Sequence, residues 1–499
     1  MATETAAAAA DLIIRNGTIV SADAATVGSI AIKDGRVLTI GADAAMPAAR
    51  ESLDASGLHV LPGAIDVHVH FRDPGWPHKE DWATGTAAAA CGGVTTVFEM
   101  PNTDPPTGTA AALAAKHETA AQKACVDFGL YGLLGEDTIE NVPELVEGGV
   151  IGFKLFMGNT FARLPSPSTG AMLEAFEVVA PTGKRISLHA ETNSIMERRQ
   201  ERLTRAGRHE PMDHLASRPA IVAIEAVSRA AILSEWTGAR IHILHISSAE
   251  ELRPLREAKA RGVDITGETC PHYVLLSTDD YHRLGGIIRV NPPVREARNR
   301  EPLWAALADG TIDMIATDHA PHTPEEKTRN DIWAVDAGFP GVETQMPLML
   351  TEVSNGRMSI CDYVRWSSYN PARMWGLHPR KGAIALGADA DLAIVDLARD
   401  FTLSDTALHS RSKISPFNGR RVRGLPLHTL VRGRFVMKDR KLLNGTQGWG
   451  HSVHRIQRMP APQVRNADST MQAITRKDAG GTAPATEQSR AAAEAAPRS

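Results

Sequence analysis

Cysteines are scarce in this chain, and their spacing is uninformative. Only four occur among the 499 residues: Cys91, Cys125, Cys270 and Cys361. No two of them form a C-x-x-C pair, so the sequence suggests neither a disulfide framework nor a thiolate zinc cluster. This usage is typical of a protein from a reducing compartment, and we expect a cytoplasmic location.

Long apolar runs and a surplus of one charge are also missing. No stretch approaches 18 uninterrupted apolar residues, and the N-terminal alanine run carries Glu4 and no basic segment, so we expect neither a membrane span nor a signal peptide. The 54 basic and 58 acidic residues leave a formal charge of −4, which gives no field to attract nucleic acid or anionic lipid. We therefore expect a small-molecule substrate, no nucleic-acid or membrane partner, and a homo-oligomer.

Eight β-rich runs fill the middle of the chain. Most are separated by stretches of helical length that are rich in Ala, Leu and Glu. Eight such alternations are what a closed parallel (β/α)₈ TIM barrel requires. The runs are GAIDVHVHF, GGVTTVFEM, FGLYGLL, GFKLFM, RISLHAE, RIHILHIS, DITGETC and IDMIATDHA.

Both ends of this region carry short strands joined by tight glycine turns. LIIR precedes Asn16-Gly17, and the late segments GAIALGADADLAIVDL and LHTLVRGRFVMKDRKLL also consist of short β-rich runs with glycine turns. We predict that residues 1–60 and 379–449 form one small β-sandwich domain beside a barrel at 61–378. Residues 450–499 are rich in Ala, Ser, Thr, Pro and charge, which predicts a disordered tail.

Metal-ligating side chains gather at the carboxyl ends of these runs, where barrel active sites are built. Any one buried histidine is more often a core residue, but the set together favours a metal. Nitrogen and oxygen ligands without thiolates suit Zn²⁺ and typically leave a position open for water, so we predict a catalytic metal. The residues are His68 and His70 on one face of the first run, Lys154 on the fourth, His189 on the fifth, His245 on the sixth and Asp318 on the eighth.

Lys154 is the unusual member, because a protonated ammonium repels a metal. Burial lowers the pKa of a lysine. The neutral amine could then react with CO₂ to give a carbamate, whose two oxygens could bridge two metals about 3.5 to 4 Å apart. The alternative is a lysine whose stem packs while its amine reaches solvent.

These motifs resemble those of the amidohydrolases that act on cyclic amides: dihydroorotases, allantoinases and hydantoinases. The resemblance runs to about Leu443 and includes DVHVHFRDPG at 66–75, GFKLFM at 152–157, HAE at 189–191 and ATDHAPH at 316–322. It implies two Zn²⁺ ions bridged by carboxylated Lys154, with His68, His70, His189, His245 and Asp318 as the other ligands. Asp318 would also be the catalytic base.

Within this family several positions favour dihydroorotase, an enzyme of pyrimidine biosynthesis. Arg72 and Asn102 look like the pair that holds the substrate carboxylate, which a guanidinium binds with charge-assisted hydrogen bonds. A salt bridge for Arg72 and a turn beside Pro101 for Asn102 are the structural alternatives. Thr160 resembles a threonine on a mobile loop, and Asn291 and His322 stand at further substrate positions.

Two other segments resemble different branches of the family. RNDIWAVDAGFPG and KISPFNG (413–419) look like stretches of L-hydantoinases and allantoinases. An allantoinase or hydantoinase with the same binuclear mechanism is therefore the alternative. A catalytically silent scaffold is a third hypothesis, but such proteins typically lose metal ligands, and all six positions are filled here.

Overall fold

Eight parallel strands form a barrel in the computed structural model, which describes residues 10–160, 164 and 166–454. Each strand pairs with the next along the chain, from β6 to β13. A parallel bridge between Val69 and His319, with a 2.7 Å bond from His70 N–H to His319 O, joins the first strand to the last. The eight predicted runs are thus confirmed as β6 (Ala64–Val69), β7 (Val94–Glu99), β8 (Asp127–Leu133), β9 (Gly152–Phe156), β10 (Arg185–His189), β11 (Arg240–Ile243), β12 (Ile265–Thr269) and β13 (Met314–Ile315).

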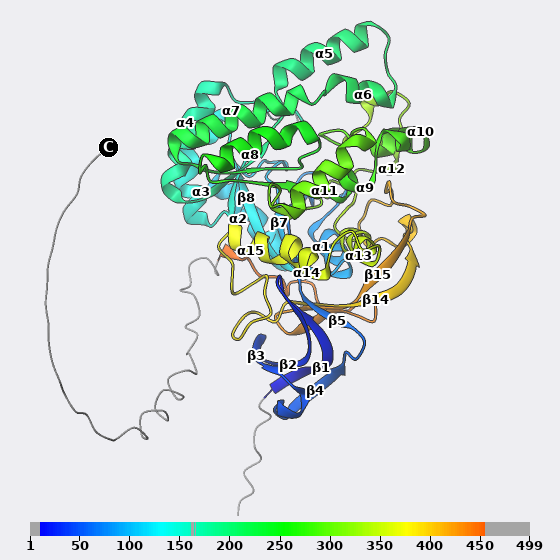
Figure 1. Ribbon diagram of the computed structural model, residues 1–499. Coiled ribbons are helices and arrows are strands. Elements are labelled where there is room, and N and C mark those ends of the chain that lie inside the picture. Colours follow the sequence, from blue (N-terminus) through cyan, green and yellow to red (C-terminus); the bar gives the residue numbers. More distant parts are fainter. Residues whose placement is uncertain (1–9, 161–163, 165, 455–499) are drawn as a thin grey trace, which may run out of the picture. The chain divides into compact units, whose positions relative to one another are not determined.

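Helices follow the strands and cover the barrel (Figure 1). Helix α1 begins where the Asp81 side chain accepts the Thr84 N–H, and it buries an alanine-rich stretch beside β7. The longer helices are α1 (Trp82–Cys91), α2 (Ala110–Lys123), α3 (Val142–Gly148), α4 (Thr169–Val179), α5 (Asn193–Arg205), α6 (Pro211–Ser217), α7 (Ile221–Thr237), α8 (Leu252–Ala260), α11 (Arg300–Ala308) and α13 (Gln345–Ser354). The shorter helices are α9 (Pro271–Leu275), α10 (Tyr281–Leu284), α12 (Pro324–Lys327), α14 (Ile360–Val364) and α15 (Asn370–Met374).

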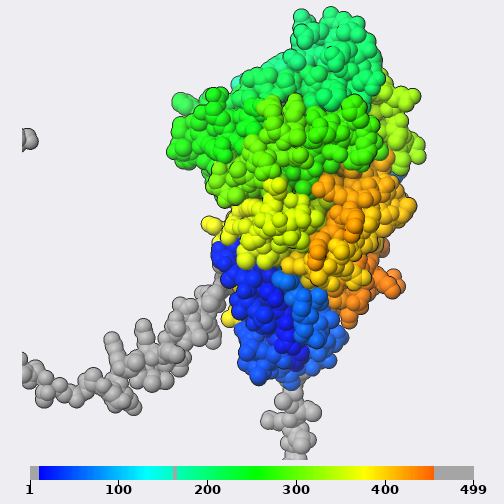
Figure 2. All heavy atoms as spheres, turned by 45° about the vertical axis from the view of Figure 1, so that its right-hand side comes forward, coloured from blue at the N-terminus to red at the C-terminus, as the bar shows by residue number. Residues whose placement is uncertain are grey.

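The two ends of the folded region together form the predicted small β domain. Its nine strands make a single sheet, in which β5 pairs parallel with β1 and antiparallel with β14 and so joins the two ends. The N-terminal strands lie beside the C-terminal ones in Figures 1 and 2. The strands are β1 (Ala10–Val20), β2 (Ala25–Lys33), β3 (Arg36–Gly41), β4 (Ala49–Asp54), β5 (His59–Pro62), β14 (Leu392–Thr402), β15 (Arg421–Val431), β16 (Arg434–Lys438) and β17 (Lys441–Leu442).

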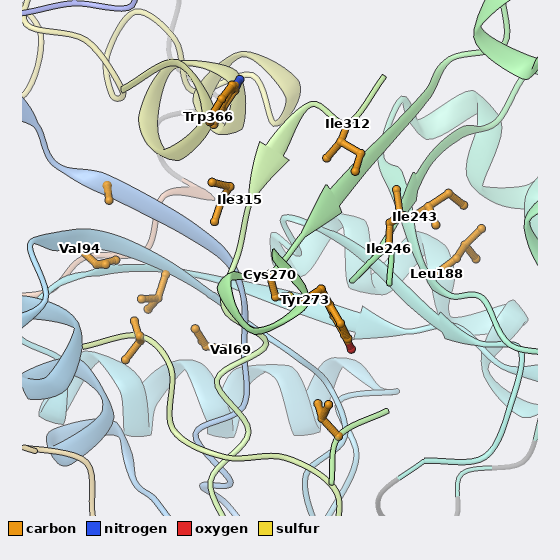
Figure 3. Packing of buried hydrophobic residues seen from close by; sticks show 14 of the residues in the cluster. Val69, Val94, Leu188, Ile243, Ile246, Cys270, Tyr273, Ile312, Ile315 and Trp366 are labelled. Atoms are coloured by element: carbon orange, nitrogen blue, oxygen red, sulfur yellow. The ribbon is translucent and has the colours of Figure 1, made fainter. Parts of the chain in front are cut away.

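Buried apolar side chains form a core in the barrel and another in the β domain. Val69, Leu188, Ile243 and Ile315 come from four barrel strands and belong to one buried cluster, part of which Figure 3 shows. The β domain has its own core, in which Ile14 and Leu392 from opposite ends of the chain are both buried. No helix among the described residues is long and apolar enough to span a membrane.

Residues after β17 return to the barrel. The Gly450 N–H donates to Ala124 O and the Val453 N–H to Phe128 O, at 2.8 and 2.9 Å. Val453 is 1% exposed. The predicted tail therefore has its first five residues against the barrel, and its remainder, 455–499, lies outside the described residues.

Candidate metal centre and active site

Ten of the eleven predicted site residues line one pocket at the carboxyl ends of the barrel strands. The barrel architecture explains this, because most of these residues lie in the last part of a strand or just after it. His322 does not line that pocket; its Nε2 lies behind Arg72, 3.3 Å from Nη2, and 3.1 Å from Ala337 O. The ten are His68, His70, Arg72, Asn102, Lys154, Thr160, His189, His245, Asn291 and Asp318.

Two of the histidines share one carboxylate oxygen. The Nε2 atoms of His68 and His70 each lie 3.2 Å from Asp318 Oδ1. These three ligand atoms lie within 4.8 Å of one another, which is close enough for one cation to contact all of them. Residues 250 positions apart in the sequence are thus brought to one point by the closure of the barrel.

The remote nitrogens of the same two histidines are held by acceptors. His68 Nδ1 lies 2.6 Å from Glu268 Oε1, and His70 Nδ1 lies 2.8 Å from Asn102 Oδ1. Because each Nδ1 must donate, each Nε2 keeps its lone pair and directs it into the pocket. Asn102 therefore orients a histidine, which is a role that the sequence did not predict.

His189 and His245 form a second group of donors. His189 Nδ1 lies 2.9 Å from His245 Nε2, and His189 Nε2 lies 2.9 Å from Glu191 Oε2. Arg218 forms a buried ion pair with Glu191 and holds the pKa of that carboxyl near 2, although burial alone would raise it. Glu191 thus stays an anion that fixes the ring of His189.

Lys154 lies between the two groups. It is 1% exposed, and its Nζ is 4.6 Å from the centre of the Phe156 ring. Burial lowers the pKa of Lys154, against the attraction of Asp318 and Glu268, and burial raises the pKa of Asp318. The alternative in which the amine reaches solvent does not describe this lysine.

These residues fit divalent cations. The candidate ligands are imidazoles and a carboxylate, without thiolate. In three of the histidines, the ring nitrogen that faces away from the pocket is hydrogen-bonded to Glu268, Asn102 or Glu191. His245 Nδ1 is buried and has no hydrogen-bond partner in the described part of the chain, so this ring is the least restrained of the four.

The backbone of the site is locally strained. Arg72, His245 and Asp318 have φ angles of +61°, +40° and +47°, in the left-handed region that these residue types seldom adopt. Such conformations cost on the order of 1–3 kcal/mol each and persist only where surrounding contacts enforce them. Their concentration at one strand-end pocket indicates a functional site.

A wider cleft of about 1230 Å³ adjoins the pocket. Thr160, Asn291 and Ala337 line both, so the cleft is the approach to the inner site. Its walls include α5 and two tryptophans, Trp76 and Trp333. A substrate ring in the inner pocket could therefore carry a substituent that extends outward.

Sequence reasoning missed the residues that orient the candidate metal ligands. Glu268 also lies 3.0 Å from His242 Nε2, so a buried chain of His68, Glu268 and His242 runs along the barrel interior. A signal was present, because Glu268 stands in the seventh run and Glu191 in the HAE motif, both at strand ends. Arg218 lies between helices and carried no such signal.

Comparisons with known proteins agree with this geometry. Residues 59–436 match the model of the amidohydrolase family. The L-hydantoinase of Paenarthrobacter aurescens is 36% identical over 450 residues, covering 89% of this chain and 98% of that protein. An allantoinase of Solibacter usitatus is 36% identical over 429 residues, 85% of this chain and 93% of that one.

Solved structures give the same result. The L-hydantoinase (dihydropyrimidinase) from Arthrobacter aurescens superposes with a TM-score of 0.86 at 36% identity, covering 89% of this chain and 99% of that one. A dihydropyrimidinase from Brevibacillus agri superposes with a TM-score of 0.83 at 29% identity, covering 89% and 98%. These relatives do not support the expectation of dihydroorotase, and the alternative of a hydantoinase or allantoinase fits them better.

Proposed function

The chain belongs to the amidohydrolase family, and we propose that it hydrolyses a cyclic ureide ring of the hydantoin type. The close approach of His68 and His70 to one oxygen of Asp318 carries the hydrolytic part of this proposal, and the relatives named hydantoinase support the type of ring. Allantoin, which is a hydantoin bearing a ureido group, is the second candidate, favoured by relatives named allantoinase.

We assign the metal to the residues that face the pocket. His68, His70 and Asp318 would hold one Zn²⁺, and His189 and His245 a second. The buried amine of Lys154 would add to CO₂ with loss of one proton, and the resulting carbamate would supply an oxygen to each ion. When bound, the two ions would supply an activated water and polarise the carbonyl of the ring.

Asp318 is the proposed proton carrier. Its carboxyl lies against both histidines and at the pocket surface, so it can accept a proton from the attacking water and deliver it to the departing ring nitrogen. The left-handed backbone at Asp318 fixes the direction of that carboxyl. Ring opening thus needs only one titrating side chain.

The remaining pocket residues would bind the ring. Arg72, Thr160 and Asn291 line the pocket and offer donors and acceptors to its amide groups. Arg72 is held from behind by His322 at 3.3 Å, so His322 would act on the substrate through Arg72. The Asn102 amide nitrogen is the group of that residue that remains for the substrate, since its oxygen serves His70.

A substrate panel tests the proposal. Zinc-loaded protein would be assayed on hydantoin, allantoin and dihydroorotate at matched metal content. We expect kcat/KM for hydantoin or allantoin to exceed that for dihydroorotate by at least about tenfold, since related pockets discriminate by contacts worth a few kcal/mol. A preference for dihydroorotate would overturn the substrate class, and no turnover of any of the three would support the scaffold hypothesis.

We also propose a homo-oligomer and a cytoplasmic location. Three apolar side chains on helix α7, Ile221, Ile232 and Trp236, are 52%, 62% and 78% exposed, which supports contact with another copy. All four cysteines are unpaired, which supports a reducing compartment. Sedimentation of Trp236→Glu beside the parent protein tests the first proposal, and fractionation of cells tests the second.

A further inference from the structure

Glu80 is a buried carboxylate outside the pocket, and it connects three separate parts of the chain. It is 0% exposed and precedes α1. It accepts hydrogen bonds from the Thr84 hydroxyl, from the Ser410 hydroxyl and, at 3.1 Å, from the Arg411 N–H. Ser410 and Arg411 belong to the segment between β14 and β15, so this loop of the β domain reaches the barrel.

The same carboxylate faces the residue that follows Asp318. His319 Nε2 lies 3.3 Å from Glu80 Oε2, and both side chains are fully buried. His319 Nδ1 accepts the N–H groups of Gly341 and Val342 at 3.0 and 3.3 Å. Because Nδ1 is an acceptor, the ring proton must be on Nε2, which lies at ion-pair distance from Glu80 but makes no hydrogen bond within the described residues.

His319 also has its backbone fixed. Its N–H donates to Thr317 Oγ1 at 3.1 Å, and its carbonyl accepts the His70 N–H at 2.7 Å. The Phe71 ring packs edge-on against the imidazole, with centres 5.7 Å apart. The backbone N–H, the carbonyl and Nδ1 of His319 all have hydrogen-bond partners, and the preceding residue is Asp318 in its left-handed conformation.

We propose that Glu80 is a positioning residue for Asp318 and acts through His319. The carboxylate fixes the imidazole, the imidazole fixes the chain on the carboxyl side of Asp318, and the strained φ angle is maintained as a result. The β domain takes part, since its loop supplies two of the donors to Glu80. Ser412 strengthens the same link, because its hydroxyl donates to His322 O at 2.6 Å.

This inference is tested by two measurements, enzyme kinetics and hydrogen exchange, and only the kinetics rests on the proposed hydrolase activity. The variant is Glu80→Gln, which keeps the shape and removes the charge. The matched control is Glu343→Gln, because Glu343 anchors the same β-domain loop through the N–H and Nδ1 of His409, at 2.7 and 2.9 Å, and among the described residues its carboxylate forms no hydrogen bond or ion pair with His319. Ser410→Ala is a milder second variant if Glu80→Gln fails to fold.

The first readout is steady-state kinetics of the zinc-loaded enzyme with zinc content measured. We expect Glu80→Gln to lower kcat, normalised to bound zinc, at least about tenfold with KM nearly unchanged, since a misdirected base acts on the chemical step. Ser410→Ala should lower kcat by a smaller factor, and Glu343→Gln should stay within about twofold of the parent. Equal losses in Glu80→Gln and Glu343→Gln, or a change in KM alone, would overturn the proposal.

The second readout is hydrogen exchange, which needs no substrate. Amides of residues 317–322 and 341–342 should exchange faster in Glu80→Gln than in the parent, and Glu343→Gln should leave residues 317–322 unchanged. If the parent turned over nothing on the substrate panel, this measurement would still decide the positioning role. Unchanged exchange in Glu80→Gln would refute it.

Discussion

His70 Nδ1 lies 2.8 Å from Asn102 Oδ1, and this bond turns the other nitrogen of the ring toward Asp318. Asn102 follows β7, while His70 follows β6, so neighbouring strands supply a proposed metal ligand and its orienting partner. The amide oxygen accepts only, which fixes the tautomer of His70. Asn102, which was expected to hold a substrate carboxylate, thus orients His70 instead.

Asn102→Ala should weaken metal binding. Loss of the acceptor frees the His70 ring, and removal of such a partner typically lowers metal affinity about 10- to 100-fold. Zinc titration against a competing chelator measures this. Asn102→Asp keeps an acceptor oxygen and should bind zinc nearly as the parent does. A raised KM with unchanged zinc affinity in Asn102→Ala would instead assign the residue to the substrate.

Lys154→Met should remove the bridge between the proposed metal ions. Methionine matches the lysine stem but cannot form a carbamate, so zinc per chain should fall from about two to about one or fewer. Elemental analysis measures the stoichiometry, and a carbamate carbon signal from ¹³C-bicarbonate should be present in the parent alone. Full zinc content in the variant would show that Lys154 has no part in holding the metal.

Asp318→Asn should separate metal binding from catalysis. An amide still offers an oxygen to the cation but cannot carry a proton, so kcat should fall by about 10²–10⁴ while much of the zinc remains. Asp309→Asn is the control, since that carboxylate pairs with Arg256 on the exposed surface. Near-normal turnover in Asp318→Asn would discard the base assignment.

The barrel could be predicted from the sequence because its signal is periodic. His68 and His70 stand two apart on a strand, and strand alternation alone places them on one face. The other ligands needed only the rule that barrel sites form at carboxyl strand ends. For these ligands, the strand pattern in the sequence and the barrel fold indicate the same residues.

Other parts of the site depend on contacts that no local pattern encodes. Glu80 and Ser410 are 330 positions apart, and their bond exists only because the β domain folds back on the barrel. His322 lies in a motif that predicted a substrate contact, yet its ring contacts Arg72 and does not line the pocket. The expectation of dihydroorotase, which the relatives do not support, depended on Arg72 and Asn102, and both have partners within the protein that the sequence did not reveal.

The buried pair of Glu99 and Lys116 should make stability depend on pH. Burial raises the pKa of Glu99 from 4.5 to about 7 despite the attraction of Lys116, and burial lowers the pKa of Lys116. A carboxyl whose pKa is raised on folding contributes stability that is complete below pH 4.5 and is lost as pH rises to about 7. We therefore expect the parent to lose on the order of 3 kcal/mol across this interval relative to Glu99→Gln.

Denaturant unfolding at intervals from pH 4.5 to 8 measures the difference, with metal-free protein so that pH-dependent metal binding does not contribute. Glu118→Gln is the matched control, because Glu118 lies on the same helix as Lys116 but is exposed. Its profile should follow that of the parent, since an exposed side chain without a buried partner contributes little to the free energy of unfolding. If Glu99→Gln also followed the parent, the carboxyl would have to be ionised throughout, and its ion pair with Lys116 would outweigh burial.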